Sequence, residues 1–313
     1  MIAVLCGGVG AARFLAGLVG VVDPAEVVAI VNTGDDTELH GLSISPDLDT
    51  ITYTLSGRVN PETGWGLAGD EFSTMDALDA LGGSTWFRLG NLDLATHLYR
   101  TGRLRQGATV TEVTAELARA FGLRLTLLPM SNEPVRTLLE LVDGGTVGFQ
   151  DYFVRLRHAV AVRAVRWPAA AAASPAPGVI EALTGARIII IAPSNPVVSI
   201  DPILAVPGIR EALRSRRERV VAISPIVAGA ALKGPADRLL TELGGSATAA
   251  GVAAWLADVV GVLVVDEADA DHAADVEAHG MTCVVTPTVM SDAEVAAGLA
   301  RTVLAAGGLT ELA

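Results

Sequence analysis

The sequence predicts an α/β protein built on a Rossmann-like, mostly parallel sheet with a largely helical insertion. Three observations lead to this prediction. The chain opens with a strand, a glycine-rich turn, a helix and a second strand, which is how open α/β sheets begin. Continuously apolar strand-like segments return in the last third, as expected for strands covered by helices on both faces. The middle of the chain has mainly helical periodicity.

The first elements follow directly from the residues. An apolar strand is expected at 1–5, and Gly7-Gly-Val-Gly10 turns the chain into a helix expected over 11–19. Asp23-Pro24 then breaks the chain before a second apolar strand at 27–31.

The middle segment, 69–178, is the predicted insertion. Helical periodicity runs through 69–140, for instance at 110–121 and 135–141. Shorter strands are expected within 142–166, with apolar–polar alternation in Phe149-Gln-Asp-Tyr-Phe-Val-Arg155, and the Ala/Pro-rich stretch 168–178 is expected to be a loop.

The last third completes the predicted sheet. Four further strands are expected at 187–192, 219–223, 261–266 and 281–285, with helices between them that include 208–217 and 248–258. We therefore predict one Rossmann-like domain formed by 1–68 and 179–313, interrupted by the insertion at 69–178.

Composition narrows the class of protein. The 313 residues carry 22 basic and 35 acidic side chains, a net charge of −13, which argues against general binding to nucleic acid or anionic membranes. The two cysteines form neither a disulfide framework nor a zinc motif, which favours a cytoplasmic protein. No uninterrupted apolar stretch of about 18 residues suggests a transmembrane helix.

Four carboxylates lie just past the second predicted strand. Asp35, Asp36, Asp47 and Asp49 fall within fifteen residues. Carboxylates crowded at the end of a strand repel one another unless a hard cation, a substrate donor or a backbone amide satisfies them. The alternative is a solvated turn whose Asp side chains bond their own backbone.

The glycine-rich turn suits an anion. Gly7, Gly8 and Gly10 follow a strand and open a helix, where backbone amides face a phosphate or diphosphate. Arg13 stands where a dinucleotide fingerprint has its third glycine, and the Gly-Lys-Ser/Thr ending of a P-loop is missing. Tight packing alone is the competing explanation.

Polar residues follow two later strands and predict a nucleotide site at the same edge of the sheet. Ser194 and Asn195 follow the strand at 187–192, and the amide of Asn195 suits a base or ribose edge. Gly229 and Gly234 allow close backbone approach, and Lys233, the only lysine in the chain, suits a phosphate.

The insertion adds three further candidates. Asp93 and His97 are four residues apart and share a helix face, which fits either a two-ligand metal site or a helix-start Asp with a buried His. Arg136 suits a phosphate or carboxylate. The aromatic residues of 149–155 fit either a ligand contact or core packing.

Taken in order, these segments closely resemble the 2-phospho-L-lactate transferases of coenzyme F-420 biosynthesis, which include the bacterial phosphoenolpyruvate transferases. The resemblance spans nearly the whole chain. It rests on Gly7-Gly-Val-Gly10, Asn32-Thr-Gly-Asp-Asp36, Ile44-Ser-Pro-Asp-Leu-Asp-Thr50, Trp65-Gly66, Asp93-Leu-Ala-Thr-His97, Phe149-Gln150, Ala192-Pro-Ser-Asn-Pro196, Ser199-Ile200, Ser224-Pro-Ile226 and Gly234-Pro-Ala-Asp237.

The resemblance implies a reaction. Such enzymes move a phosphorylated three-carbon unit, lactyl or enolpyruvyl, from a guanosine diphosphate-linked donor to the ribityl hydroxyl of the deazaflavin Fo, and they release GMP. It also implies Mg²⁺, a homodimer, and Fo binding by Asp49 and Arg88. The sequence does not discriminate between the lactyl and enolpyruvyl donors.

Within this scheme we expect Mg²⁺ on Asp35 and Asp49, the diphosphate on the glycine-rich turn, and the guanosine side held by Ser194, Asn195, Lys233 and Asp237. Asp49 is also expected to orient the attacking hydroxyl. Whether Asp36 and Asp47 touch the metal or only shape the turn stays open. Two positions depart from the family pattern, because Asn91 and Asn132 stand where Asp is frequent. Each departure removes a charge and argues against an ionic role there.

The sequence leaves three alternatives to this scheme. A dinucleotide-dependent Rossmann oxidoreductase requires an acidic residue at the end of the second strand, where this chain has Asn32. A non-catalytic nucleotide-binding regulator binds GDP without making a product. A sugar-nucleotide transferase shares the metal and diphosphate chemistry and differs in its acceptor.

Overall fold

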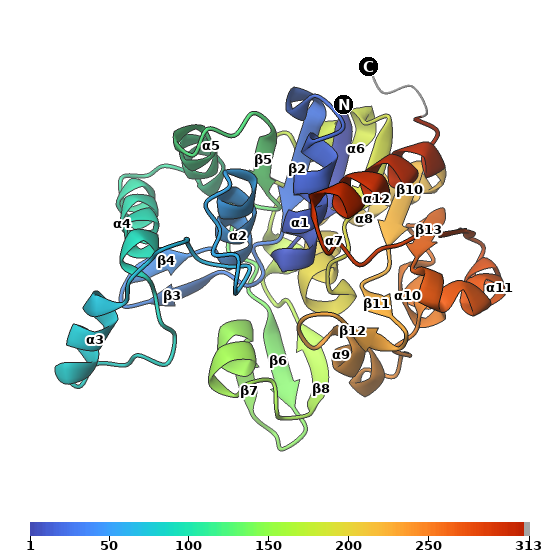
Figure 1. Cartoon of the computed structure of the whole chain (residues 1–313). Helices are drawn as coiled ribbons and strands as arrows, with labels where there is room; N and C mark the ends of the chain where they lie inside the picture. The colour runs from blue at the N-terminus through green and yellow to red at the C-terminus, as the bar shows by residue number, and fades with distance from the viewer. Residues whose placement is uncertain (310–313) are drawn as a thin grey trace.

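A seven-stranded parallel sheet runs through the computed structural model, which describes residues 1–309 (Figure 1). The last four residues of the predicted Rossmann-like domain, 310–313, lie outside the described part. The strand order is β14-β13-β10-β9-β1-β2-β5. The bounds are β1 (Ile2–Cys6), β2 (Val27–Val31), β5 (Thr126–Pro129), β9 (Ile188–Ile191), β10 (Val220–Ile223), β13 (Val262–Val265) and β14 (Thr282–Val285).

The order of the strands creates a crevice at β1. The chain moves from β1 outward to β2 and β5, and later builds β9, β10, β13 and β14 on the opposite side. The registers pair Ile2 with Val27 on one side and with Ile188 on the other. In open α/β sheets, ligands bind beyond the carboxyl ends of the strands at such a point of reversal.

Helices cover both faces of the sheet because its strands are apolar on both faces. Ile2 and Val4 belong to the core beneath α1 and α12, whereas Ala3 and Leu5 belong to the core of the opposite face. The α-helices are α1 (Gly8–Val19), α2 (Pro46–Leu55), α3 (Ser73–Ala80), α4 (Asn91–Arg105), α5 (Val110–Ala120), α6 (Val179–Gly185), α7 (Asp201–Ala205), α8 (Ile209–Arg214), α9 (Ala236–Glu242), α10 (Ala249–Leu256), α11 (Ala273–Glu277) and α12 (Ala293–Ala306). None of the helices within residues 1–309 has the length and apolarity to span a bilayer.

Three smaller sheets accompany the main sheet within the described residues. A three-stranded antiparallel sheet of β6 (Leu138–Leu141), β7 (Thr146–Gly148) and β8 (Val162–Arg166) lies below the carboxyl ends of the main strands in Figure 1. Two hairpins complete the set, β3 (Thr37–Leu39) with β4 (Leu42–Ile44), and β11 (Ile226–Val227) with β12 (Ala230–Ala231).

Three details of the middle segment differ from the sequence-based expectation. The helix expected at 135–141 is instead strand β6, whose partners β7 and β8 lie further along the chain. The alternating strand expected at 149–155 is a π-helix at Asp151–Arg155. Strand β5, inside the predicted insertion, pairs with β2 in the main sheet, so the insertion is not a separate unit throughout.

The packing of α1 on α12 gives a first prediction. A Cβ on Gly17 would lie 2.5 Å from the backbone carbon and oxygen of Ala296, so Gly17→Ala forces the helices apart. We expect a loss of about 1–3 kcal/mol in the free energy of unfolding, measured by denaturant titration. Gly298→Ala is the matched control, because its Cβ meets open space, and it should stabilise the protein by about 0.5–1 kcal/mol. Equal effects of the two substitutions would contradict this packing argument.

Candidate active site

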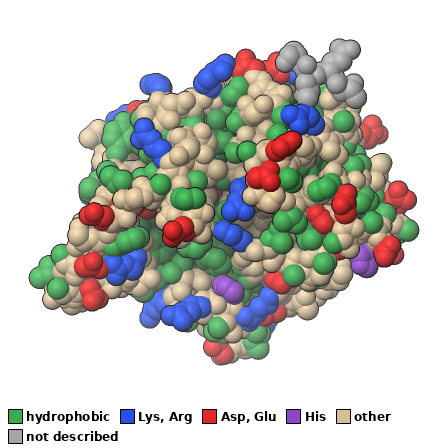
Figure 2. Space-filling model, in the orientation of Figure 1, with side chains coloured by type: hydrophobic (Ala, Val, Ile, Leu, Met, Phe, Trp, Pro, Cys, Tyr) green, Lys and Arg blue, Asp and Glu red, His purple; other side chains and the backbone are tan. Residues whose placement is uncertain are grey.

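A cavity of about 990 Å³ opens at the carboxyl ends of the central strands. Its walls come from the segments after β1, β2, β9 and β10, and from α2, α4 and the 149–154 segment. Figure 2 shows a hollow in this face bordered by Lys and Arg side chains. The size suits a nucleotide together with a second small molecule.

The glycine-rich turn lines the cavity at the point where α1 begins. Helix α1 begins at Gly8, whose φ of +76° favours glycine. A Cβ on Gly7 would lie 2.5 Å from Asp47 Oδ2, and one on Gly10 would lie 2.5 Å from the Pro193 carbonyl oxygen. Ser194 Oγ accepts a hydrogen bond from Gly7 N (3.2 Å) and donates one to Gly7 O (2.9 Å). The glycines therefore serve close packing as well as backbone access.

Asn32 organises the carboxylates beside this turn. Its Nδ2 donates to Asp35 Oδ1 (3.1 Å), Asp47 Oδ2 (2.9 Å) and the Val198 carbonyl oxygen (3.3 Å). Its Oδ1 accepts from Gly34 N (2.8 Å). One NH₂ group with two hydrogens thus serves three acceptors, and among Asp35, Asp36 and Asp47 the buried oxygen without a hydrogen-bond partner is Asp36 Oδ1.

Burial is the main influence on the pKa values of Asp35, Asp36 and Asp47. Burial, followed by the neighbouring charge of Asp47, raises the pKa of Asp35 well above its usual range. Burial raises the pKa of Asp36 to about 8 and that of Asp47 to about 6, although Ser45 and Asn32 respectively oppose the shift. None of the three forms an ion pair with a described residue. Oxygen donors that lack a positive partner fit a hard cation.

Asp49 lies two residues after Asp47 on α2, in a different environment. Both its carboxylate oxygens accept from the guanidinium of Arg100, with Nη1 3.1 Å from Oδ2 and Nη2 on Oδ1. Arg100 Nη1 also lies 3.2 Å from His97 Nδ1, and since an arginine only donates, that ring nitrogen accepts. Asp49 is thus a buried carboxylate with a compensated charge.

A chain of polar contacts extends this network. His97 Nε2 lies 3.2 Å from Asp93 Oδ2, and Tyr53 donates to Asp93 Oδ1 at 2.6 Å. Burial raises the pKa of Asp93, but His97 and Tyr53 outweigh it, so the pKa of that carboxyl is lowered overall. Ligand atoms of Asp49, Asp93 and His97 lie within 4.8 Å of one another, a spacing that could hold a metal ion. The Arg100 guanidinium bound to Asp49 makes a second cation there costly.

Comparisons with known proteins agree with this architecture. The family described as 2-phospho-L-lactate transferase CofD matches residues 2–297. The chain belongs to the CofD family. It is 45% identical to a phosphoenolpyruvate transferase of Kitasatospora aureofaciens, with 97% of each chain covered. It is 36% identical to a 2-phospho-L-lactate transferase of Methanosarcina mazei, covering 97% of this chain and 99% of the relative.

A solved structure supports the fold of this CofD-family chain. The crystal structure of a Bacillus halodurans protein of the upf0052 family matches 97% of this chain and 98% of its own, with a TM-score of 0.64 at 20% sequence identity. At that identity the likeness concerns the fold alone.

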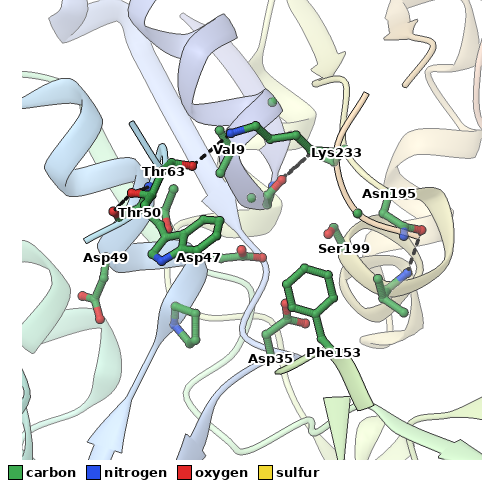
Figure 3. A pocket seen from close by; sticks show the side chains of 18 of the residues that line it. Val9, Asp35, Asp47, Asp49, Thr50, Thr63, Phe153, Asn195, Ser199 and Lys233 are labelled. Atoms are coloured by element: carbon green, nitrogen blue, oxygen red, sulfur yellow. Dashed lines mark hydrogen bonds between the residues drawn. The ribbon is translucent and has the colours of Figure 1, made fainter. Parts of the chain in front are cut away.

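The structure of this CofD-family member brings most of the predicted site residues into one cavity. Figure 3 places Asp49 on one side, Asp35 and Asp47 near the centre, and Asn195 and Lys233 on the other side. The predicted residues that line the cavity are Gly7, Gly8, Gly10, Asp35, Asp49, Arg88, Ser194, Asn195, Lys233 and Gly234. Gly229 and Asp237 are not among the lining residues, and Asp237 instead accepts a hydrogen bond from Arg238 N.

Two predicted residues have partners that refine their expected roles. Asn195 Oδ1 accepts from Val197 N at 3.0 Å and caps a second π-helix, Pro196–Ile200, so its NH₂ group is the part that can meet a ligand. Arg88 pairs with Asp76 at 2.5 Å and lies over the ring of Phe72, 5.2 Å from its centroid. Arg88 is thus held at the mouth by an acidic and an aromatic neighbour.

Sequence reasoning did not single out Arg100 or assign a role to Asn32. Asp93, His97 and Arg100 follow an i, i+4, i+7 spacing, which places them on one face of α4 and was a usable signal. Asn32 gave no comparable signal, because its role depends on two carboxylates fifteen and three residues away that converge only in the fold.

Proposed function

We propose that this chain transfers a phosphoenolpyruvyl unit from a guanosine diphosphate-linked donor to the ribityl hydroxyl of Fo, with release of GMP. The observation that carries the proposal is a nucleotide-sized cavity in a CofD-family chain, in which unpaired carboxylates face a glycine-rich helix start. The relatives at 45% and 44% identity are named phosphoenolpyruvate transferases, which favours the enolpyruvyl donor over the lactyl one.

The proposal includes Mg²⁺ held by Asp35 and Asp47, the two carboxylates that share Asn32 and lack a positive partner. When bound, the metal supplies charge stabilisation to the diphosphate. The sequence predicts that Asp49 binds the metal and also orients the acceptor hydroxyl. Its pairing with Arg100 makes it better suited to orienting the acceptor, because each of its oxygens keeps a lone pair for a substrate hydroxyl.

The transfer step is an in-line displacement. The ribityl oxygen forms a bond to the phosphorus that carries the three-carbon acid, while the bond from that phosphorus to the GMP oxygen breaks. The hydroxyl proton is released to solvent and GMP leaves with the bonding electron pair. Asp49 aligns the hydroxyl, and the amides at the start of α1 donate to the diphosphate.

Mass spectrometry tests the proposal. Fo is incubated with the enzyme and a synthetic enolpyruvyl or lactyl guanosine diphosphate, with Mg²⁺ or with EDTA. We expect a mass gain on Fo matched by GMP, larger with the enolpyruvyl donor and absent with EDTA. No mass gain on Fo in any combination would refute the transferase assignment, and full activity in EDTA would refute the metal.

A further inference from the structure

Two cationic side chains, Arg13 and Lys233, line the cavity near the first turns of α1, although they come from different parts of the chain. Val9 and Arg13 are four residues apart, on one face of the helix, and both line the cavity. Lys233 comes from the segment between β12 and α9. Gly64 lies next to both Val9 and Lys233, because a Cβ added to it would lie 2.9 Å from Val9 Cγ1 and 3.2 Å from Lys233 Nζ. The Lys233 ammonium therefore lies beside the start of α1, to which Val9 belongs.

Lys233 is held in place by a backbone carbonyl and not by a carboxylate. Its Nζ donates to the Thr63 carbonyl oxygen at 2.9 Å, as Figure 3 shows. This bond uses one of the three ammonium hydrogens and leaves two for a ligand. Partial burial, followed by the charge of Arg13, lowers the pKa of Lys233, consistent with two cations that face the same space.

Neither cation has an acidic partner among the described residues. Eleven of the other twenty arginines form ion pairs, for instance Arg100 with Asp49 and Arg103 with Glu116. Arg13 and Lys233 form no ion pair. In a chain with a net charge of −13, two unpaired cations beside a helix N-terminus are complementary to an anion of at least two charges.

We propose that Arg13 and Lys233 form a two-cation clamp for the diphosphate of the donor, with Lys233 positioned by the Thr63 carbonyl. The proposal rests on the proposed function and adds Arg13 as a residue that contacts substrate. As the bond to GMP breaks, negative charge develops on the departing phosphate. Two fixed cations beside it stabilise the transition state more than the ground state, and the clamp therefore affects kcat as well as binding.

Binding of inorganic pyrophosphate and GDP, measured by calorimetry without Mg²⁺, tests the clamp directly. Arg13→Gln and Lys233→Gln should each weaken both ligands about 10- to 100-fold, the range expected for a charge-assisted hydrogen bond. Arg13→Lys should restore part of the affinity, and Fo affinity should change less than twofold. The matched control is Arg301→Gln, an exposed arginine on α12 outside the cavity, which should leave all three affinities unchanged.

The single lysine offers a second measurement on the unaltered protein. An amine-acylating reagent can modify only Lys233 and the N-terminal amine, and peptide mapping separates the two. Pyrophosphate should protect Lys233 and leave the N-terminus reactive. This readout keeps the proposal testable even if a variant does not fold.

The outcomes separate the clamp from the transferase assignment. Wild-type affinity for pyrophosphate in both Gln variants, or no protection of Lys233, would overturn the clamp even if Fo gains mass. Weaker pyrophosphate binding by the Gln variants and protection of Lys233 from acylation, without any product from Fo, would support the clamp and refute the proposed function. In an active enzyme, both Gln variants should also lower kcat at least about tenfold with the KM for Fo unchanged; an unchanged kcat would overturn the role in the transition state.

Discussion

Asp35→Asn will keep the fold and lower transfer activity at least about a hundredfold, equivalent to roughly 2.7 kcal/mol of transition-state stabilisation. Asparagine has the shape of aspartate, and its carbonyl oxygen can still accept from Asn32 Nδ2. What it removes is one of the two charges that we assign to the metal. Steady-state rates of GMP release at saturating Mg²⁺ measure the loss.

The same substitution should reduce the pH dependence of stability. The pKa of Asp35 is raised in the folded protein by burial and by Asp47, so the folded state retains a proton that the unfolded chain releases. Stability is therefore lost as pH rises from about 4 through the folded pKa. Without metal, the melting temperature of Asp35→Asn should fall less between pH 5 and pH 8 than that of the wild type.

Asp201→Asn is the matched control. Asp201 is buried outside the cavity, accepts from Trp255 Nε1 at 2.8 Å, and has a pKa raised to about 7 by burial. Its substitution should flatten the pH dependence of stability in the same direction and leave transfer intact. Loss of activity in both variants would indicate a general folding effect, and retained activity in Asp35→Asn would contradict a metal role for that carboxylate.

The main sheet was predictable because its strands are buried on both faces. The segments at 27–31 and 188–192 are continuously apolar, and such runs between helices have few alternatives. Strand β5 (Thr126–Pro129) was not predicted, since it is four residues long, ends in proline and lies between segments with helical periodicity. Strand β5 forms because it pairs with β2, which lies about one hundred residues earlier in the chain, and no local sequence pattern shows this pairing.

The two segments assigned incorrectly show the limits of periodicity. In 135–141 the apolar residues fall at spacings of three and four, which match a helix, yet β7 and β8 supply hydrogen-bonding partners that make a strand. In 149–155 the alternation suggested a strand, but 151–155 form a π-helix, and Phe153 on it stacks on the preceding Phe149 with ring centroids 5.5 Å apart. Tertiary contacts override a weak local signal in both cases.

The site was predictable in its residue types and less so in its pairings. The cluster of carboxylates just past the second predicted strand, which contains Asp35 and Asp49, was recognisable because crowded carboxylates there need a partner. The partner of Asp49 could not be read from its neighbours, since Arg100 is 51 residues away. The pairing divides the acidic residues into a compensated one, Asp49, and three that form no ion pair, Asp35, Asp36 and Asp47, of which Asp35 and Asp47 share Asn32.

That division makes Arg100→Leu the most destabilising single change that we expect at the site. Arg100 is 3% exposed, and its removal leaves Asp49 buried without a positive partner and leaves His97 Nδ1 without its donor. Breaking a buried ion pair by removing one member typically costs about 3–5 kcal/mol. Denaturant unfolding measures the loss, and the variant should also lose activity because Asp49 is no longer oriented.

Arg103→Leu is the control on the same helix, because its pairing with Glu116 is more exposed and water replaces the lost contact, so its cost should be far smaller. Adding Asp49→Asn to Arg100→Leu should recover part of the lost stability, since the unpaired charge is then gone, but no activity. Equal costs for Arg100→Leu and Arg103→Leu would show that Asp49 does not depend on Arg100. Recovery of activity in the double variant would show that Asp49 acts on the acceptor through its shape and not through its charge.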